Sequence, residues 1–347
     1  MRMNNTEKQF LELLSKSIRN DNNVEFYEDV NWSNLINLAG EHMVEGIIYP
    51  LVAEKASTFN INNNILEELK TFSFYTSISE IRKISYLEKI LKIFKESNIE
   101  FIALNELVLR NLYPQPEQRS MINIDLLVKK QDLKNVKKVL KSIEYDVDAY
   151  NKYSVKFTHR LYPTVAIHWV LADGEALDDS IWENVVKCSI LDNELITLGY
   201  EYFLLNLCNS IINDISKSGL VLRQITDIVL FAEVNREFID WNNFIVQARK
   251  QKIEKFVLII FSLCNILFKM DLPEALLDRD IMYSPNIDIL IEDLFLGIIY
   301  GINGEKNILS NTTKQDYGII ENIRKVIRSK KIDKDREKVI KWLEIQL

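Results

Sequence analysis

Glycine is scarce in this chain of 347 residues, with nine in all and none between Gly46 and Gly174. A phosphate-binding loop of the Walker or Rossmann type needs several closely spaced glycines, because its backbone approaches the phosphates directly. Such a loop cannot exist in that stretch. Gly297, Gly301 and Gly304 do not form one either, since their spacing differs and no Lys-Ser or Lys-Thr follows them.

Cysteine and long apolar runs are also few. Cys188, Cys208 and Cys264 are isolated in the sequence, which argues against zinc sites and disulfide frameworks. Cys208 and Cys264 lie in apolar helical runs and are expected to be buried thiols. The longest apolar stretches, residues 256–268 and 294–300, are too short to span a bilayer, and the N-terminus lacks the apolar core of a signal peptide. These features predict a soluble, cytoplasmic protein without a membrane partner.

An excess of positive charge is lacking as well. The chain has 43 Lys and Arg against 50 Asp and Glu, a net charge of -7 and a pI near 5.3. Nucleic-acid binders are usually basic, so nucleic acid is not an expected partner. The length, with 47% hydrophobic and 27% charged residues, predicts a globular protein with one large or two modest cores.

Helical spacing of apolar residues dominates both ends of the chain. It predicts helices over residues 7–18, 32–39 and 65–94, the last of them ending at Asn98. Helices are expected to return from Leu177 onward, and the predicted ones include residues 201–215, 222–234, 241–250, 253–268, 287–300 and 317–347.

The pattern between these helical regions is different. Short runs rich in Ile, Leu and Val predict strands around two helices, with the strands at residues 99–104, 121–128, 145–150, 153–161 and 164–171. The fold class is therefore α+β and mostly helical, with a small mixed sheet. The expected division is an N-terminal helical region over 1–98, an α/β core over 99–175 and a C-terminal helical region over 176–347.

Asn123 and Asp125 are the first candidates for chemistry. They lie two positions apart in an expected strand, so their side chains point to the same face. Two carboxylates at this spacing are a standard way to hold Mg²⁺ on a triphosphate, because Mg²⁺ prefers hard oxygen ligands. Here only Asp125 is a carboxylate, and Asn123 offers an uncharged carbonyl oxygen.

Residues 104–128 read LNELVLRNLYPQPEQRSMINIDLLV. This stretch resembles the signature of the uncharacterised bacterial nucleotidyltransferase family, roughly L-K-G-x-x-L, then L-Y, then R-x-M-x-D-I-D-L-L-V. Residues 32–51, Ile167-His168-Trp169 and residues 222–248 resemble further parts of that family, so the resemblance covers most of the chain. It implies the polymerase-beta-like nucleotidyltransferase fold, and it implies Mg²⁺ and an NTP as the cofactors of an active member.

The departures from the signature fall on functional positions. Asn105 and Glu106 replace its lysine and glycine, Asn123 replaces its first carboxylate, and Ala166 occupies the position of a third. Asp125 is the one carboxylate that remains, while other matching residues are kept, namely Tyr113, Arg119, His168 and Trp169. The resemblance thus implies catalytic positions at Asp125 and Asn123, nucleotide-binding positions at Asn105, Glu106 and Arg119, and a metal position at Asp125.

Each replacement has a physical meaning. A glycine lets the backbone approach phosphates closely, whereas Glu106 adds bulk and negative charge. Asn105 cannot offset phosphate charge as lysine does, and Ala166 has no atom that binds a metal. The two-metal mechanism is therefore not expected to survive. Glu106 could still turn toward Asp125 and act as a metal ligand.

Several other residues allow two interpretations. Asp146 and Asp148 form a second alternating pair, but the favoured interpretation is a charged edge strand that discourages aggregation. Arg119 could bind a phosphate with its planar guanidinium group, or it could tie its loop to Glu117 or Asp125. His168 is interpreted as a hydrogen-bonded structural residue beside Trp169 rather than as a catalytic base.

Three functional hypotheses follow. The first is a nucleotidyltransferase-like pseudoenzyme with a degenerate metal site, which binds a nucleotide, a peptide or a protein partner. The second is an active enzyme that uses Asp125, Asn123 and Glu106 to transfer a nucleoside monophosphate from an NTP to a small-molecule, peptide or protein acceptor. The third is a helical interaction protein in which apolar side chains fill the space beside Asp125.

Overall fold

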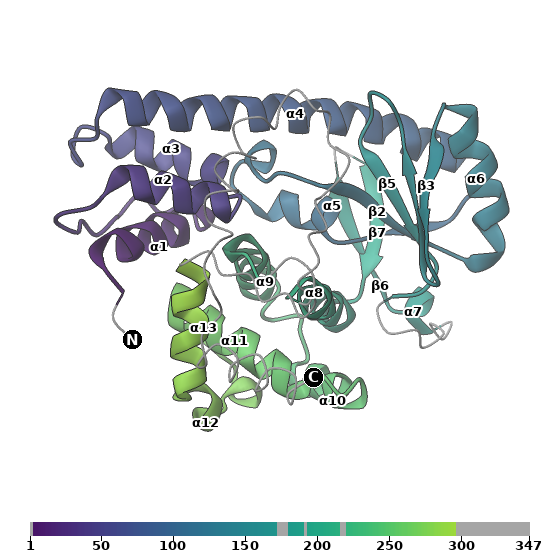
Figure 1. The fold of residues 1–347 in the computed structure, drawn as a ribbon. Coiled ribbons are helices and arrows are strands. Elements are labelled where there is room, and N and C mark those ends of the chain that lie inside the picture. The colour runs from purple at the N-terminus through teal and green to yellow at the C-terminus, as the bar shows by residue number, and fades with distance from the viewer. Residues whose placement is uncertain (1–2, 172–179, 191–192, 216–219, 296–347) are drawn as a thin grey trace.

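The computed structural model describes residues 3–171, 180–190, 193–215 and 220–295. Within these residues helices predominate, and one seven-stranded sheet of mixed direction accompanies them in the order β3-β4-β5-β2-β1-β7-β6. This confirms the predicted α+β, mostly helical class. In Figure 1 the N-terminal helices lie to one side, the sheet to the other and the C-terminal helices below.

The N-terminal region is helical, as the apolar spacing predicts. Asn31 starts the second helix by accepting a hydrogen bond from the backbone N–H of Asn34 at 3.0 Å. The long fourth helix stops just before Asn98, which takes a left-handed φ of 51°. The four helices are α1 (Asn5–Ile18), α2 (Trp32–Glu41), α3 (Glu45–Lys55) and α4 (Asn63–Glu96).

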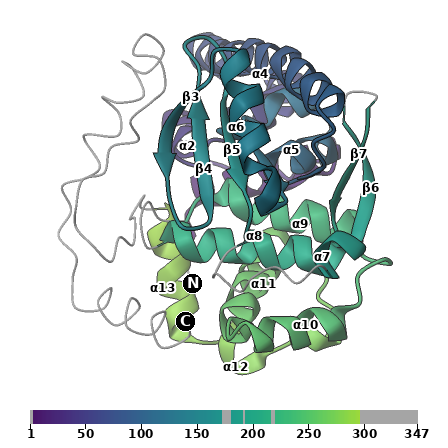
Figure 2. The same ribbon diagram turned by 90° about the vertical axis from the view of Figure 1, so that its right-hand side faces the viewer.

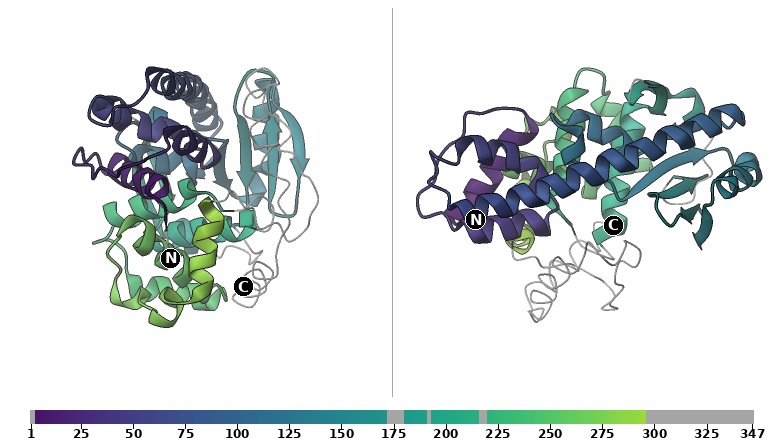
Figure 3. Two further views of the ribbon diagram at one scale, coloured as in Figure 1. Left: turned by 60° about the vertical axis from the view of Figure 1, so that its left-hand side comes forward. Right: turned by 90° about the horizontal axis from the view of Figure 1, so that it is seen from above.

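Helix α4 connects the two halves of the upper layer. Seen from above in Figure 3, it runs from the N-terminal helices to the sheet. Its middle contacts the loop before β2 through polar side chains: Ser73 donates to Gln118 at 2.9 Å, and Gln118 donates to Ser77 at 2.8 Å. The helix therefore helps to position the chain that leads into the central strand.

The centre of the sheet consists of β1 (Phe101–Ala103), β2 (Asn123–Val128) and β5 (Thr164–His168). Strand β2 is antiparallel to β1 and parallel to β5. Between β1 and β2 the chain forms short helical turns, α5 (Glu106–Leu109), Arg110–Leu112 and Pro116–Gln118. Helix α6 (Leu133–Ser142) follows β2, and is one of the helices expected among the strands.

One edge of the sheet is β3 (Asp146–Tyr150), which pairs with β4 (Ser154–Thr158). Every residue of β3 is exposed. Asp146 and Asp148 therefore lie on a solvent-facing edge strand, which agrees with the favoured interpretation of this pair.

The other edge corrects the sequence analysis. Strands β6 (Val185–Ile190) and β7 (Asn193–Leu198) extend the sheet past residue 175, where helices were expected from Leu177 onward. Short apolar runs of this length suit either a helix or a strand until a partner is known. Here β7 runs parallel to β1, with Thr197 opposite Ala103. The division of the chain into three domains remains a prediction.

The C-terminal helices lie beneath the sheet in Figure 2. Buried apolar residues from the N-terminal helices, the sheet and these helices form one continuous core, which includes the buried thiols Cys208 and Cys264. The elements are α7 (Ser180–Glu183), α8 (Tyr200–Ile215), α9 (Leu222–Val234), α10 (Trp241–Lys250), α11 (Glu254–Phe268), the turn Glu274–Leu276, α12 (Arg279–Met282) and α13 (Pro285–Phe295).

Two sequence-based expectations concern the chain beyond this point. The helix predicted over 317–347 and the end of the one predicted over 287–300 lie outside the described residues. Within the described part of the chain, no helix is both long enough and apolar enough to cross a membrane.

Candidate functional site

Asp125 lies on the central strand β2, with Asn123 two positions earlier on the same face. The parallel register of β2 and β5 sets Asn123 opposite Thr164 and Asp125 opposite Ala166. Ala166 is 1% exposed. The neighbouring strand thus places a buried methyl group beside Asp125, at the position where the resemblance implies a third carboxylate.

His168 is the polar partner of Asp125. Its Nε2 lies 2.9 Å from Oδ1 of Asp125, and the two side chains are 25% and 12% exposed. His168 stands two residues after Ala166 on β5, so both face the side that carries Asp125. His168 is hydrogen-bonded, as expected, but it is partly open to solvent rather than enclosed in the core.

Glu106 does not turn toward Asp125. Its Oε1 accepts hydrogen bonds from Nη1 of Arg119 at 3.0 Å and from Nη2 of Arg223 at 3.2 Å, and its Oε2 accepts from the backbone N–H of Ile122. Burial opposes ionisation of this carboxyl group, but the two guanidinium groups and the amide outweigh it and lower the pKa of Glu106. Glu106 is therefore a carboxylate held by cationic partners from two elements.

Arg119 is committed to an ion pair inside the protein. Its Nε and Nη2 donate to Oδ1 and Oδ2 of Asp227 at 3.1 and 2.6 Å, and the whole residue is 1% exposed. The ionic partners of Arg119 are thus Asp227 and Glu106. The sequence-based alternatives, Glu117 and Asp125, were wrong. A two-point pair of this kind fixes the orientation of both side chains.

Tyr113 belongs to the same group. Its hydroxyl donates to Oδ1 of Asp227 at 2.8 Å and lies 2.9 Å from the hydroxyl of Thr226. Burial and the neighbouring Asp227 raise the pKa of Tyr113 well above its usual value. The Tyr-Pro loop is therefore anchored to α9 by a neutral phenol and a buried arginine.

Asn105 takes an unusual backbone conformation immediately before α5, with φ 46° and ψ −124°. Its side chain does not cap that helix; its Oδ1 instead accepts a hydrogen bond from Nδ2 of Asn206 in α8 at 2.6 Å. Asn105 thus joins the start of α5 to the C-terminal helices.

The sequence analysis missed the roles of Arg223 and Asp227, although residues 222–248 entered the resemblance. Both lie on α9, four positions apart and so on one helix face, and both are buried. The available signal was that two charged residues lie on one face of a helix rich in apolar residues, where burial requires a partner of opposite charge.

Glu80 is a further charged residue that sequence reasoning missed. It is fully buried in α4 and pairs with Lys83 at 2.6 Å, and Lys83 also donates to the carbonyl oxygen of Met121 just before β2. Burial raises the pKa of Glu80. The chain entering β2 is therefore held by a hydrogen bond from Lys83 of α4 and by the ion pair of Arg119 with Asp227 of α9.

The described residues contain no cluster of three or more His, Cys, Asp or Glu side chains arranged to hold a metal ion. Asp125 faces His168, Glu106 faces two arginines, and Ala166 has no donor atom. The candidate metal ligands Asp125 and Glu106 are therefore engaged with different partners.

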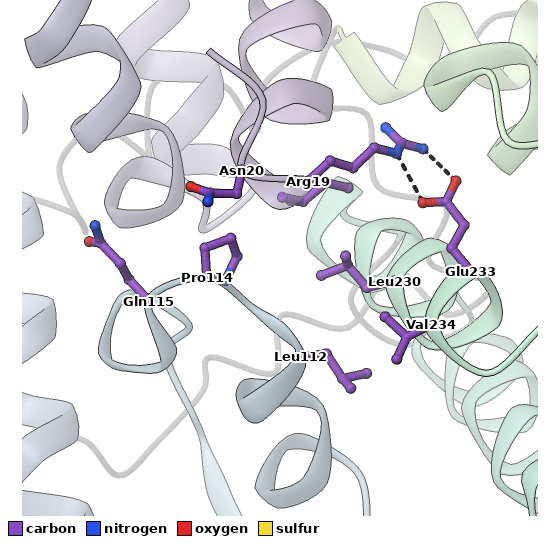
Figure 4. Close-up of a pocket in the computed structure, with 9 residues that line it drawn as sticks. Arg19, Asn20, Leu112, Pro114, Gln115, Leu230, Glu233 and Val234 are labelled. Carbon is purple, nitrogen blue, oxygen red and sulfur yellow. Dashed lines mark hydrogen bonds and ion pairs between the residues drawn. The ribbon is translucent and has the colours of Figure 1, made fainter.

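Two cavities border the loop after Tyr113. The larger has a volume of about 520 Å³, and Figure 4 shows its wall: Arg19 paired with Glu233 on one side and Pro114 and Gln115 on another. The smaller, of about 180 Å³, shares Asn20, Pro114 and Gln115 with it. Neither cavity is lined by any of the residues implied for catalysis or nucleotide binding.

The model of a family described as uncharacterised nucleotidyltransferase matches residues 28–269. A search of curated proteins gives no match.

Solved structures of antibiotic-modifying proteins are similar over part of the chain. A solution structure of the antibiotic-resistance factor ANT(2'')-Ia has 11% identity and a TM-score of 0.40, and the match covers 50% of this chain and 96% of that one. The lincomycin-bound lincosamide antibiotic adenylyltransferase LnuA has 16% identity and a TM-score of 0.33, with 43% and 95% covered.

Proposed function

This chain belongs to the uncharacterised nucleotidyltransferase family, and we propose that it is a member whose metal-dependent nucleotidyl transfer is impaired or lost. It acts instead by binding a nucleotide, a peptide or a protein partner on the sheet face that carries Asp125. The observation that carries this proposal is the engagement of Glu106 by Arg119 and Arg223, away from Asp125.

The argument is one of ligand number and charge. Mg²⁺ gives up its water reluctantly and is held by clustered carboxylates together with substrate phosphates. On this face Asp125 is the carboxylate, Asn123 adds at most a neutral oxygen, and Ala166 adds none. The residues present therefore do not fit a two-metal site, and no reaction step is assigned to one.

The same face retains what a binding role needs. Asp125 and His168 form a hydrogen-bonded polar pair, in which the His168 side chain is 25% exposed. A few fixed hydrogen-bonding groups that orient a ligand are a usual part of a binding site. These residues support a binding function for the nucleotidyltransferase-like frame.

A second candidate is an active enzyme that transfers a nucleoside monophosphate from an NTP, with Mg²⁺, to a small-molecule, peptide or protein acceptor. Family membership favours it, and so does the partial exposure of His168, at 25%, beside Asp125. In this scheme Asp125, assisted by Asn123, holds the metal, and His168 orients the Asp125 carboxylate through their hydrogen bond.

Labelled NTPs separate the two candidates. The purified protein is incubated with each NTP and Mg²⁺ or Mn²⁺, and transfer to itself, to small molecules and to co-purified partners is measured beside Asp125→Ala. We expect no transfer that depends on Asp125. Transfer by the wild-type protein that disappears in Asp125→Ala would overturn the proposal and establish the enzyme.

Calorimetry adds a second criterion. Binding of an NTP without turnover would identify the nucleotide as the partner, whereas absence of Mg-NTP binding at millimolar ligand would count against the active enzyme. Asp148→Ala is a matched control, because it removes a carboxylate from the exposed edge strand β3 rather than from the centre of the sheet.

A further inference from the structure

The carboxylate of Glu106 sits in a group of donors that resembles a binding site for an external anion. We define the Glu106 cradle as the guanidinium groups of Arg119 and Arg223 together with the backbone N–H of Ile122. These donors come from two parts of the chain, the loop before β2 and helix α9, and converge on the two oxygens of one side chain. Planar guanidinium groups and backbone amides are the usual donors for carboxylates and phosphates.

The charges around the cradle balance only when Glu106 is included. Arg119 and Arg223 carry two positive charges, while Asp227 and Glu106 carry two negative ones, and their side chains are between 2% and 14% exposed. Asp227 is already occupied by both a two-point pair with Arg119 and the hydroxyl of Tyr113. Removal of the Glu106 carboxylate would therefore leave one buried positive charge without compensation.

The donors would stay in place without Glu106, because other groups hold them. Asp227 fixes Arg119 through Nε and Nη2, and Ser120 fixes Arg223 by accepting from its Nη1 at 2.9 Å through the carbonyl and at 2.7 Å through the hydroxyl. Arg119 Nη1 and Arg223 Nη2 remain directed at the place of the carboxylate. Preorganised donors of this kind bind a replacement anion without a large rearrangement.

The cradle is also within reach of solvent. Glu106 is the most exposed of the four charged side chains, at 14%, and the adjacent Ile122 is 48% exposed. A small anion could thus enter along the path that the Glu106 side chain now fills.

We infer that Glu106 is an internal anion, whose carboxylate occupies a site suited to a phosphoryl or carboxylate group and closes it to external ligands. This deepens the proposed function and rests on it for one point, that the wild-type chain does not use this site for nucleotidyl transfer. A purely structural ion pair would behave differently, because its loss could not be repaired by an anion from solution.

Glu106→Ala tests the inference without nucleotide or metal. Melting temperature is followed against increasing inorganic phosphate, and separately against formate, at constant ionic strength. We expect either anion to raise the melting temperature of Glu106→Ala and to bind at least about tenfold more tightly than to wild type, as one charge-assisted hydrogen bond would allow. A response to phosphate alone assigns the site to phosphoryl groups, and an equal response to formate assigns it to anions in general.

Two controls isolate the cradle. Glu100→Ala removes an exposed carboxylate paired with Lys129, so it changes the net charge equally and should give no anion response. Adding Arg223→Gln to Glu106→Ala removes the uncompensated charge and should abolish the response.

Glu106→Gln keeps the shape of the side chain and removes its charge, so it fills the site and should respond to anions less than Glu106→Ala does. The inference is overturned if Glu106→Ala responds to anions as wild type does, or if it stays unfolded in saturating phosphate and formate. Nucleotidyl transfer by the wild-type protein would overturn the proposed function, but it would leave the anion response of these variants unchanged.

Discussion

Arg119, in the chain leading to the central strand, and Asp227, in α9, form a buried two-point ion pair although they are 108 residues apart in the sequence. The pair joins the sheet to the C-terminal helices. Because Arg119 also contacts Glu106, its position affects the candidate site as well as the packing of the two parts.

The first prediction concerns this pair. Asp227→Asn should lower the free energy of unfolding by about 3–5 kcal/mol, because a buried arginine loses its main counter-charge. Urea unfolding measures the loss. Glu254→Gln, which breaks the surface pair with Arg249, should change the free energy of unfolding by less than about 1 kcal/mol. Equal effects in the two variants would show that Asp227 contributes no more than a surface partner.

The second prediction concerns the hydrogen bond between Asp125 and His168. Asp125→Asn and His168→Gln, alone and together, form a double-mutant cycle. We expect a coupling energy of roughly 1–2 kcal/mol, since the bond is charge-assisted but partly open to solvent. Urea unfolding of the four proteins gives the value. Free-energy changes that add without coupling would mean that the contact contributes nothing to stability.

The third prediction follows from His42. Burial lowers the pKa of His42 from 6.5 to about 4, and its Nδ1 accepts a hydrogen bond from the backbone N–H of Leu222 at 3.2 Å. Between these pH values the unfolded chain takes up a proton that the folded chain does not. The contribution of neutral His42 to the free energy of unfolding is therefore fully present above pH 6.5. It is lost as the pH falls toward 4, by up to about 3 kcal/mol.

His42→Gln measures this contribution. Urea unfolding at a series of pH values should show a shallower loss of stability below pH 6.5 for the variant than for wild type. Other titrating groups are common to both proteins, so the difference in slope reports His42. Parallel curves for the two proteins would refute the prediction.

The fourth prediction concerns the restoration of carboxylates at the centre of the sheet. Asn123→Asp with Ala166→Asp places three carboxylates, together with Asp125, on adjacent positions of β2 and β5. Without metal this variant should be less stable by a few kcal/mol, because an unpaired charge is buried at position 166. Mn²⁺ should then raise its melting temperature, since binding to the folded state stabilises it.

Its control combines Asn123→Asp with Ala149→Asp, where Ala149 lies on the exposed edge strand β3. This variant has the same net charge but no third carboxylate beside Asp125. Calorimetry with Mn²⁺ should detect binding to the first variant and not to the second. An equal response would mean that the sheet centre cannot form a metal site even with its carboxylates restored.

The sequence by itself determined the class of fold and proposed the place of the candidate site. The spacing of apolar residues was sufficient to predict α1, α2 and α4, because the buried face of an amphipathic helix is visible in the sequence of that helix alone. The motif around Asp125 predicted strand β2, and it predicted that Asn123 and Asp125 point to the same face. Side chains alternate between the two faces of any strand, so this prediction needs no knowledge of the partner strands.

Only the tertiary structure decided which partners these residues have. Strands β6 and β7 are recognisable as strands through their pairing with β1, which lies far away in the sequence. Likewise, Glu106 and Arg119 meet Arg223 and Asp227 across more than 100 residues. Ion pairs and strand pairs of this kind depend on distances in space that no local pattern contains, so the commitment of Glu106 to arginines rather than to Asp125 became visible only in the folded chain.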